Sequence, residues 1–168
     1  MPGDAPTEVR LLGTLHEVDG AGAVRFEDRL AATADEVWSV LTDPARLAQW
    51  LGTVDGELRP GGELRAHWHA SGWEGTVRIE TCEPPHRLLV RTAAEDEPDG
   101  TVELTLTPDG AHTQLVVEDR GLPPAHLAAY AAGNQIHLED LAAHLAGCGR
   151  CDPRTRFGQL HAAYQAHR

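Results

Sequence analysis

Five short segments of strand type, followed by one long segment of helical type, fill most of residues 63–147 and limit what the chain can fold into. Ser-Gly, Pro-Pro and Asp-Gly pairs punctuate the strand segments, which cover residues 63–70, 73–82, 86–92, 101–107 and 113–119. Connections this short favour antiparallel pairing of consecutive strands. Leucine and alanine then recur at helical spacing from Pro124 to Gly147. We therefore expect an α+β fold with a meander of strands before one long helix.

The first fifty residues add two more strands and two short helices. Val9–Val18 and Val24–Leu30 flank an Asp-Gly-Ala-Gly turn, which predicts a β-hairpin. Thr33 and Glu36 have the spacing of a capping box, in which each side chain bonds the backbone amide of the other residue. Asp43-Pro44 then starts a second short helix, because proline loses no hydrogen bond at the first helical position.

Three motifs carry a family resemblance, and they read VWSVLTDPARLAQW, LRPGGELR and YAAGNQIHLEDLAAHLAG. They resemble the START-like (polyketide cyclase, or SRPBCC) superfamily, and within it the branch named after the activator of the heat-shock-protein-90 ATPase. The resemblance covers about residues 24–147. It implies a helix-grip fold, in which a curved antiparallel sheet of six or seven strands wraps around the long C-terminal helix. Two short helices follow the first strands, and a pocket lies between the sheet and the long helix.

The implied fold sets the expected domain organisation. We expect one helix-grip domain over residues 1–150 and a C-terminal tail over residues 151–168, with a short helix from Phe157 onward. A sheet that folds around a helix needs bulges or glycines, and Gly75 is a candidate for such a position.

The faces of the strands and of the long helix predict which side chains line the pocket. The predicted ligand-binding residues are Trp68, Trp73, Val90, Leu104, Val117, Asp119, Tyr130, Asn134 and Leu138. Members of the family that the chain resembles commonly have tryptophan where this chain has Asn134. Where this chain has Asp119, they commonly have a more basic or neutral polar residue. These two side chains would orient a ligand; alternatively, Asp119 ends its strand in solvent and Asn134 bonds to backbone. Trp68 and Trp73 form either an aromatic rim or ordinary core packing.

Three functions fit these residues, and the leading one is binding of a hydrophobic or aromatic small molecule in the cavity. The alternative is an enzyme of the cyclase, aromatase or dehydratase kind, whose polar pocket residues transfer protons. Its catalytic candidates are Asp119, Tyr130 and His137. A chaperone cofactor is a third reading, suggested only by the name of the resembling family. We expect no cofactor for the leading function.

Histidines and cysteines near the end of the long helix raise the question of a metal. His126, His137 and His144 share one side of this helix, but ~10 Å or more of helical rise separates each from the next, so they cannot share one ion. We expect these histidines to be solvated. The spacing of His144, Cys148, Cys151 and His161 permits a zinc site, and the two cysteines could instead form a disulfide. Free thiols without metal are the favoured interpretation.

The charge of the chain disfavours two classes of partner. The formal net charge is -12, which disfavours nucleic acid and anionic membranes because both require clustered cations. All 14 basic residues are arginine, so catalysis through a lysine Schiff base is excluded.

The N-terminal sequence lacks the pattern of a secretory signal, and no apolar run reaches the ~20 residues of a membrane span. We therefore expect a cytoplasmic protein, and the sequence permits a homodimer.

Overall fold

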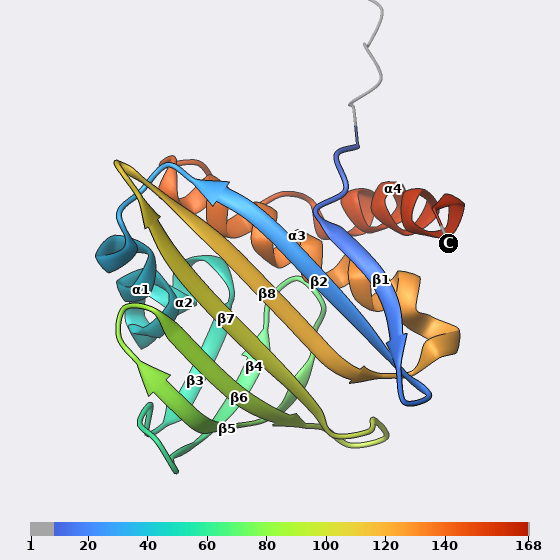
Figure 1. Ribbon diagram of the computed structural model, residues 1–168, viewed down its shortest axis with the longest axis horizontal. Coiled ribbons are helices and arrows are strands. Elements are labelled where there is room, and N and C mark those ends of the chain that lie inside the picture. Colours follow the sequence, from blue (N-terminus) through green and yellow to red (C-terminus); the bar gives the residue numbers. More distant parts are fainter. Residues whose placement is uncertain (1–8, 168) are drawn as a thin grey trace, which may run out of the picture.

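The computed structural model describes residues 9–167, and over this range one sheet of eight strands is the main element (Figure 1). The expected domain limits at residues 1 and 168, and the N-terminal sequence in which no secretory signal was predicted, lie outside the described residues. The spatial order of the strands is β1-β2-β8-β7-β6-β5-β4-β3, and all neighbouring pairs are antiparallel. The strands are β1 Gly13–Val18, β2 Ala21–Leu30, β3 Gly52–Gly56, β4 Glu63–Trp68, β5 Glu74–Glu83, β6 Arg87–Ala93, β7 Gly100–Asp109 and β8 His112–Leu122.

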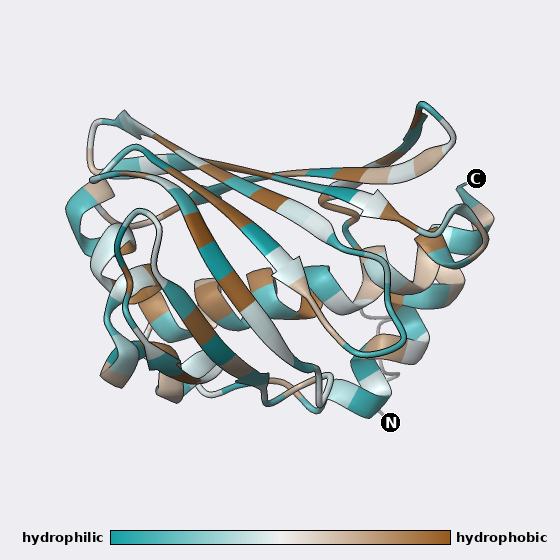
Figure 2. Ribbon diagram, turned by 90° about the horizontal axis from the view of Figure 1, so that it is seen from below, coloured by the Kyte–Doolittle hydropathy of each residue, from teal (hydrophilic) through white to brown (hydrophobic). Residues whose placement is uncertain are grey.

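The sheet curves around one long helix, which confirms the helix-grip fold (Figure 2). Apolar and polar residues alternate along the strands, so the face towards the helix is mostly apolar. Across the residues that the structure describes, no helix is both long and apolar enough to cross a membrane. The helical elements are α1 Ala34–Thr42, α2 Pro44–Trp50, the 3-10 helix η1 Pro124–His126, α3 Leu127–Leu145 and α4 Pro153–Ala166.

Local sequence signals explain most of the element boundaries. Asp19 and Gly20 have φ values of 52° and 80°, so the expected hairpin between β1 and β2 turns through two left-handed residues. The Thr33 hydroxyl accepts a hydrogen bond from the Glu36 amide at 3.3 Å and caps α1. The second half of the expected capping box is absent, because the Glu36 carboxylate pairs with Arg46 at 2.6 Å instead.

The C-terminal tail forms a longer helix than predicted. Helix α4 begins at Pro153, four residues before Phe157, because the Asp152 side chain accepts a hydrogen bond from the Arg154 amide at 3.1 Å and caps it. Its residue Tyr164 is fully buried, and its hydroxyl accepts a hydrogen bond from the Gly13 amide at 2.9 Å and donates one to Gln135. Helix α4 is therefore joined to both α3 and β1.

The described part of the sheet has eight strands, one more than the upper end of the six or seven expected, because the β3 segment was not predicted as a strand. Strand β3 is an edge strand of five residues that pairs with β4. A Cβ atom at Gly52 would lie 2.0 Å from the His67 carbonyl oxygen, so only glycine allows the two strands to approach this closely.

Register shifts of the kind that a curved sheet was expected to need occur in two strands. The strand register shifts between Gly22 and Ala23 in β2 and between Ile79 and Thr81 in β5, rather than at Gly75. A Cβ atom at Gly75 would lie 2.4 Å from the Ala93 carbonyl oxygen of β6 and 2.5 Å from the Trp73 ring. Glycine at this position therefore lets both the β6 backbone and the indole approach β5 closely.

Two clusters of apolar side chains form the interior. The larger cluster packs β2, β7 and β8 against α1, α2, α3 and α4, and the smaller one covers the inner face of β4, β5 and β6. Val102 and Leu104 of β7 pack against both clusters. The clusters do not fill all the space between sheet and helix, and the pocket described next occupies the remainder.

Candidate functional site

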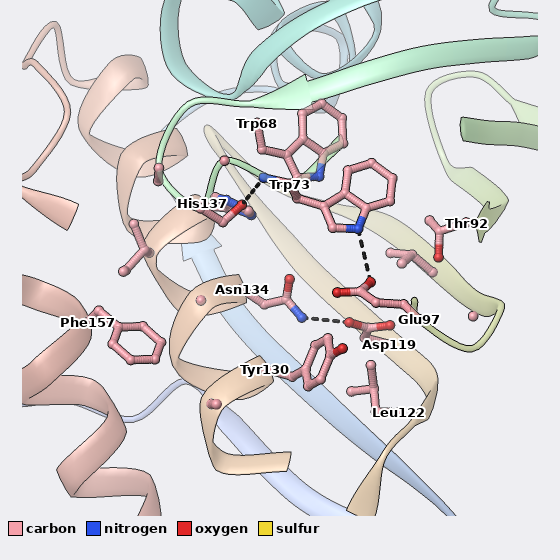
Figure 3. Close-up of a pocket in the computed structure, with 18 of the residues that line it drawn as sticks. Trp68, Trp73, Thr92, Glu97, Asp119, Leu122, Tyr130, Asn134, His137 and Phe157 are labelled. Atoms are coloured by element: carbon pink, nitrogen blue, oxygen red, sulfur yellow. Dashed lines mark hydrogen bonds between the residues drawn. The ribbon is translucent and has the colours of Figure 1, made fainter. Parts of the chain in front are cut away.

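A pocket of about 750 Å³ lies between the sheet, α3 and the start of α4 (Figure 3). Its aromatic and polar lining comes from four parts of the fold: the β4–β5 turn region, the loop between β6 and β7, the end of β8, and the helices. The side chains that matter for its chemistry are Trp68, Trp73, Glu97, Asp119, Tyr130, Asn134, His137 and Phe157.

A buried carboxylate and an amide form the polar centre of the pocket. Alternation along β8 directs Leu115, Val117 and Asp119 to the same inner face, and Asp119 is only 8% exposed. Asn134 on α3 donates a hydrogen bond from Nδ2 to Asp119 Oδ2 at 2.6 Å. The alternative interpretation, with Asp119 in solvent and Asn134 bonded to backbone, is therefore wrong.

No arginine in residues 9–167 forms an ion pair with Asp119. The neighbouring Arg120 belongs to the opposite face of β8 and pairs with Glu103 and Glu118. Burial without a cation raises the pKa of Asp119 to about 6, an effect that the hydrogen bond from Asn134 opposes and the charge of Glu97 increases. The carboxyl group therefore titrates close to neutral pH.

Two stacked indoles form the aromatic wall of the pocket. The ring centroids of Trp68 and Trp73 are 5.6 Å apart and their planes are inclined by 22°. Trp73 donates a hydrogen bond from Nε1 to Glu97 Oε2 at 3.1 Å, which links the β4–β5 turn to the loop between β6 and β7. Both indoles also pack against the smaller core cluster, so they combine the two roles that the sequence left open.

Two further groups from α3 complete the polar lining. His137 is half-buried, and its Nε2 atom is enclosed without a hydrogen-bond partner in the described residues, so the expectation of a solvated side chain is wrong for it. Its ring meets Trp68 edge-on, at a centroid distance of 6.4 Å. Burial lowers the pKa of His137 to about 4, which keeps the imidazole uncharged at neutral pH. Burial, with the nearby carboxylates of Glu97 and Asp119, raises the pKa of Tyr130.

Four of the predicted ligand-binding residues lie outside the lining and belong to the core: Val90, Leu104, Val117 and Leu138. All four side chains point to the inside of the fold, as expected. They pack against other core side chains, at positions along the strands and the helix that lie away from the pocket. Conversely, the lining includes Glu97 and Phe157, which the sequence did not single out. Glu97 lies in an acidic loop that has neither strand nor helix periodicity, so no pattern in the sequence indicated it. Phe157 is an exposed aromatic residue of α4, and an aromatic side chain in a polar tail was a signal that could have been used.

The cysteine and histidine side chains near the end of α3 do not form a metal site in the described part of the chain. No group of three or more His, Cys, Asp or Glu side chains in residues 9–167 is arranged to hold a metal ion, and this includes the set of His144, Cys148, Cys151 and His161. The three cysteines of the chain are free thiols. The Cys151 amide donates to Asp140 at 2.9 Å, and burial raises the pKa of the Cys151 thiol to about 11, so the thiol stays protonated.

The fold and the pocket place the protein in the START-like superfamily of helix-grip domains, whose fold is that of a ligand-binding domain. More narrowly, the chain belongs to the family described as Activator of Hsp90 ATPase homolog 1-like protein, whose family model matches residues 31–146. A comparison with curated proteins found no match.

Solved structures share the fold over most of the chain. CalU16 from Micromonospora echinospora is 28% identical with a TM-score of 0.75, over 92% of this chain and 94% of CalU16. DynU16, a protein of the dynemicin biosynthetic locus, is 32% identical with a TM-score of 0.70, over 77% of this chain but only 50% of DynU16. EF2215 from Enterococcus faecalis, at 20% identity and a TM-score of 0.71, is similar in fold alone.

Proposed function

We propose that the protein binds a hydrophobic or aromatic small molecule in the pocket between the sheet and α3. The observation that carries the proposal is a pocket of about 750 Å³ with an aromatic wall and a single buried carboxylate–amide pair. Sites for small molecules are typically concave, largely apolar and furnished with a few oriented polar groups. The likeness to DynU16, which comes from a biosynthetic locus, supports a ligand of the kind that such loci make or modify.

Asn134 is a lining position at which a larger side chain is expected to reduce the volume of the pocket. It occupies the middle of the helical side of the pocket, opposite Asp119 (Figure 3). A tryptophan at this position would extend into the cavity and displace a ligand, whereas asparagine leaves the space open and offers one donor and one acceptor group.

The second candidate function is catalysis by proton transfer, which the raised pKa of Asp119 favours. A carboxyl group with a pKa of about 6 can act as a general acid or base near neutral pH. Tyr130 lines the same pocket and could position a substrate hydroxyl or carbonyl. His137, with its pKa lowered to about 4, is a poor proton donor at neutral pH. A role as chaperone cofactor rests on the family description alone.

Binding of a neutral fluorescent probe tests the leading proposal. We expect N-phenyl-1-naphthylamine to bind with a dissociation constant on the order of 1 µM, roughly -8 kcal/mol. Asn134→Trp should abolish binding while circular dichroism and the unfolding midpoint show an intact fold. Ala162→Trp is the matched control, because Ala162 is exposed on α4 and outside the pocket. If Asn134→Trp binds the probe as the parent does, the ligand site lies elsewhere.

A further inference from the structure

The charges around the pocket are unbalanced. Among the residues that the structure describes, five side chains in its lining can ionise: Glu97, Asp119, Tyr130, His137 and Arg154. Arg154 is exposed at the start of α4, while the imidazole of His137 is uncharged near neutral pH because of its burial. Within residues 9–167, the interior of the pocket therefore presents carboxylate charge that no arginine pairs with, since Arg154 lies exposed at its edge.

The carboxylate of Asp119 is buried without a cationic partner in the part of the chain that the structure describes. The Asn134 amide donates one hydrogen bond to it at 2.6 Å, and the carboxylate of Glu97 repels it. A carboxylate keeps acceptor capacity for several hydrogen bonds, so one amide donor leaves most of that capacity unused. The fold has already removed this group from water, so a ligand need not meet that cost on binding.

Aromatic faces surround the same space. The stacked pair of Trp68 and Trp73 and the ring of Tyr130 line the pocket around Asp119 (Figure 3). Aromatic faces attract cations through the ring quadrupole, and tryptophan does so most strongly. The Trp73 indole is fixed in place by its hydrogen bond to Glu97, whose carboxylate adds negative charge at the mouth of the pocket.

From these observations we propose that the ligand is an aromatic or apolar molecule that carries a protonated amine, with the amine on Asp119 and the apolar body against Trp68 and Trp73. This assignment rests on the proposed binding function and narrows it to a chemical class. An ammonium group donates hydrogen bonds to the carboxylate and supplies its missing counter-charge. A carboxylate or phosphate on the ligand would instead be repelled by Asp119 and Glu97.

Three naphthalene probes of similar size and different charge test this assignment: 2-naphthylmethylamine, 2-naphthalenemethanol and 2-naphthoate. Calorimetric titration near pH 7.5 should give the amine an affinity at least about tenfold higher than the alcohol, because hydrogen bonds to charged groups are stronger than neutral ones. The carboxylate probe should bind most weakly. Asp119→Asn should bring the ratio of amine to alcohol affinity close to one.

The control variant is Asp55→Asn, which removes the same charge from the exposed edge strand β3 and should leave the ratio unchanged. Equal binding of amine and alcohol to the parent, or an unchanged ratio in Asp119→Asn, would overturn the amine assignment while the binding function stands. If none of the three probes binds, both the assignment and the proposed function fail.

Discussion

Replacing Asp119 with asparagine should stabilise the protein at neutral and alkaline pH. Asparagine has nearly the same shape and can still accept the hydrogen bond from Asn134, so the change removes the charge and little else. The pKa of Asp119 is about 6 in the fold against 3.8 for the ordinary group. At about 1.4 kcal/mol per pKa unit, this difference corresponds to about 3 kcal/mol of unfolding free energy.

The sign follows from which state holds the proton more tightly. Because the folded pKa is raised, the folded state binds the proton more tightly than the unfolded state between about pH 4 and pH 6. The parent therefore loses stability as the pH rises through this window, and above pH 6 the full cost of the buried charge is present. The variant carries no such charge, so its advantage should be near zero at about pH 4 and reach about 3 kcal/mol at about pH 8.

Urea unfolding of the parent and the variant at these two pH values measures the effect. For a chain of this length, a gain of about 3 kcal/mol also corresponds to a rise in Tm of roughly 6–12 °C at the higher pH. The exposed variant Asp55→Asn reports any general effect of the net charge. A difference between Asp119→Asn and the parent that does not change with pH, or a variant less stable at about pH 8, would refute the reasoning.

Three further substitutions test how the pocket is supported. Tyr164→Phe removes the hydroxyl that bonds the Gly13 amide and Gln135, so urea unfolding should show a loss of about 1–3 kcal/mol. Gly52→Ala would place a Cβ atom 2.0 Å from the His67 carbonyl, and hydrogen exchange should show faster opening of the β3–β4 pair; unchanged protection would contradict the proposed close contact. Asp152→Ala removes the cap of α4 and should cost about 1 kcal/mol in the same unfolding assay, whereas an unaltered midpoint would mean that the cap contributes nothing.

The elements with strong local signals could be predicted from the sequence. The Asp19-Gly20 turn, the Asp43-Pro44 helix start and the turns between the later strands appear in the structure as expected. The start of α4 could have been predicted in the same way, because Asp152-Pro153 repeats the signal of Asp43-Pro44. Strand β3 could not be predicted, because its sequence GTVDG is short and glycine-rich. This segment is a strand through its pairing with β4.

The pocket was harder to predict than the fold. Strand parity assigns a side chain to the inner face of the sheet, but the distance between sheet and helix depends on the curvature, which parity does not contain. Val117 and Asp119 thus share one face, yet one fills the core and the other lines the pocket. His137 contacts Trp68, which is distant in sequence, so the periodicity of the helix alone could not predict the surroundings of this side chain.

The most direct test of a ligand site in this pocket is the position of a bound probe. Nuclear Overhauser contacts between N-phenyl-1-naphthylamine and the protein distinguish the pocket from a second hollow of about 400 Å³ beside β1 and α4. The pocket proposal predicts contacts from the probe to the indole protons of Trp68 and Trp73 and to the ring of Tyr130. Contacts to Leu15 and Tyr164 in the second hollow, with none to the two indoles, would contradict it.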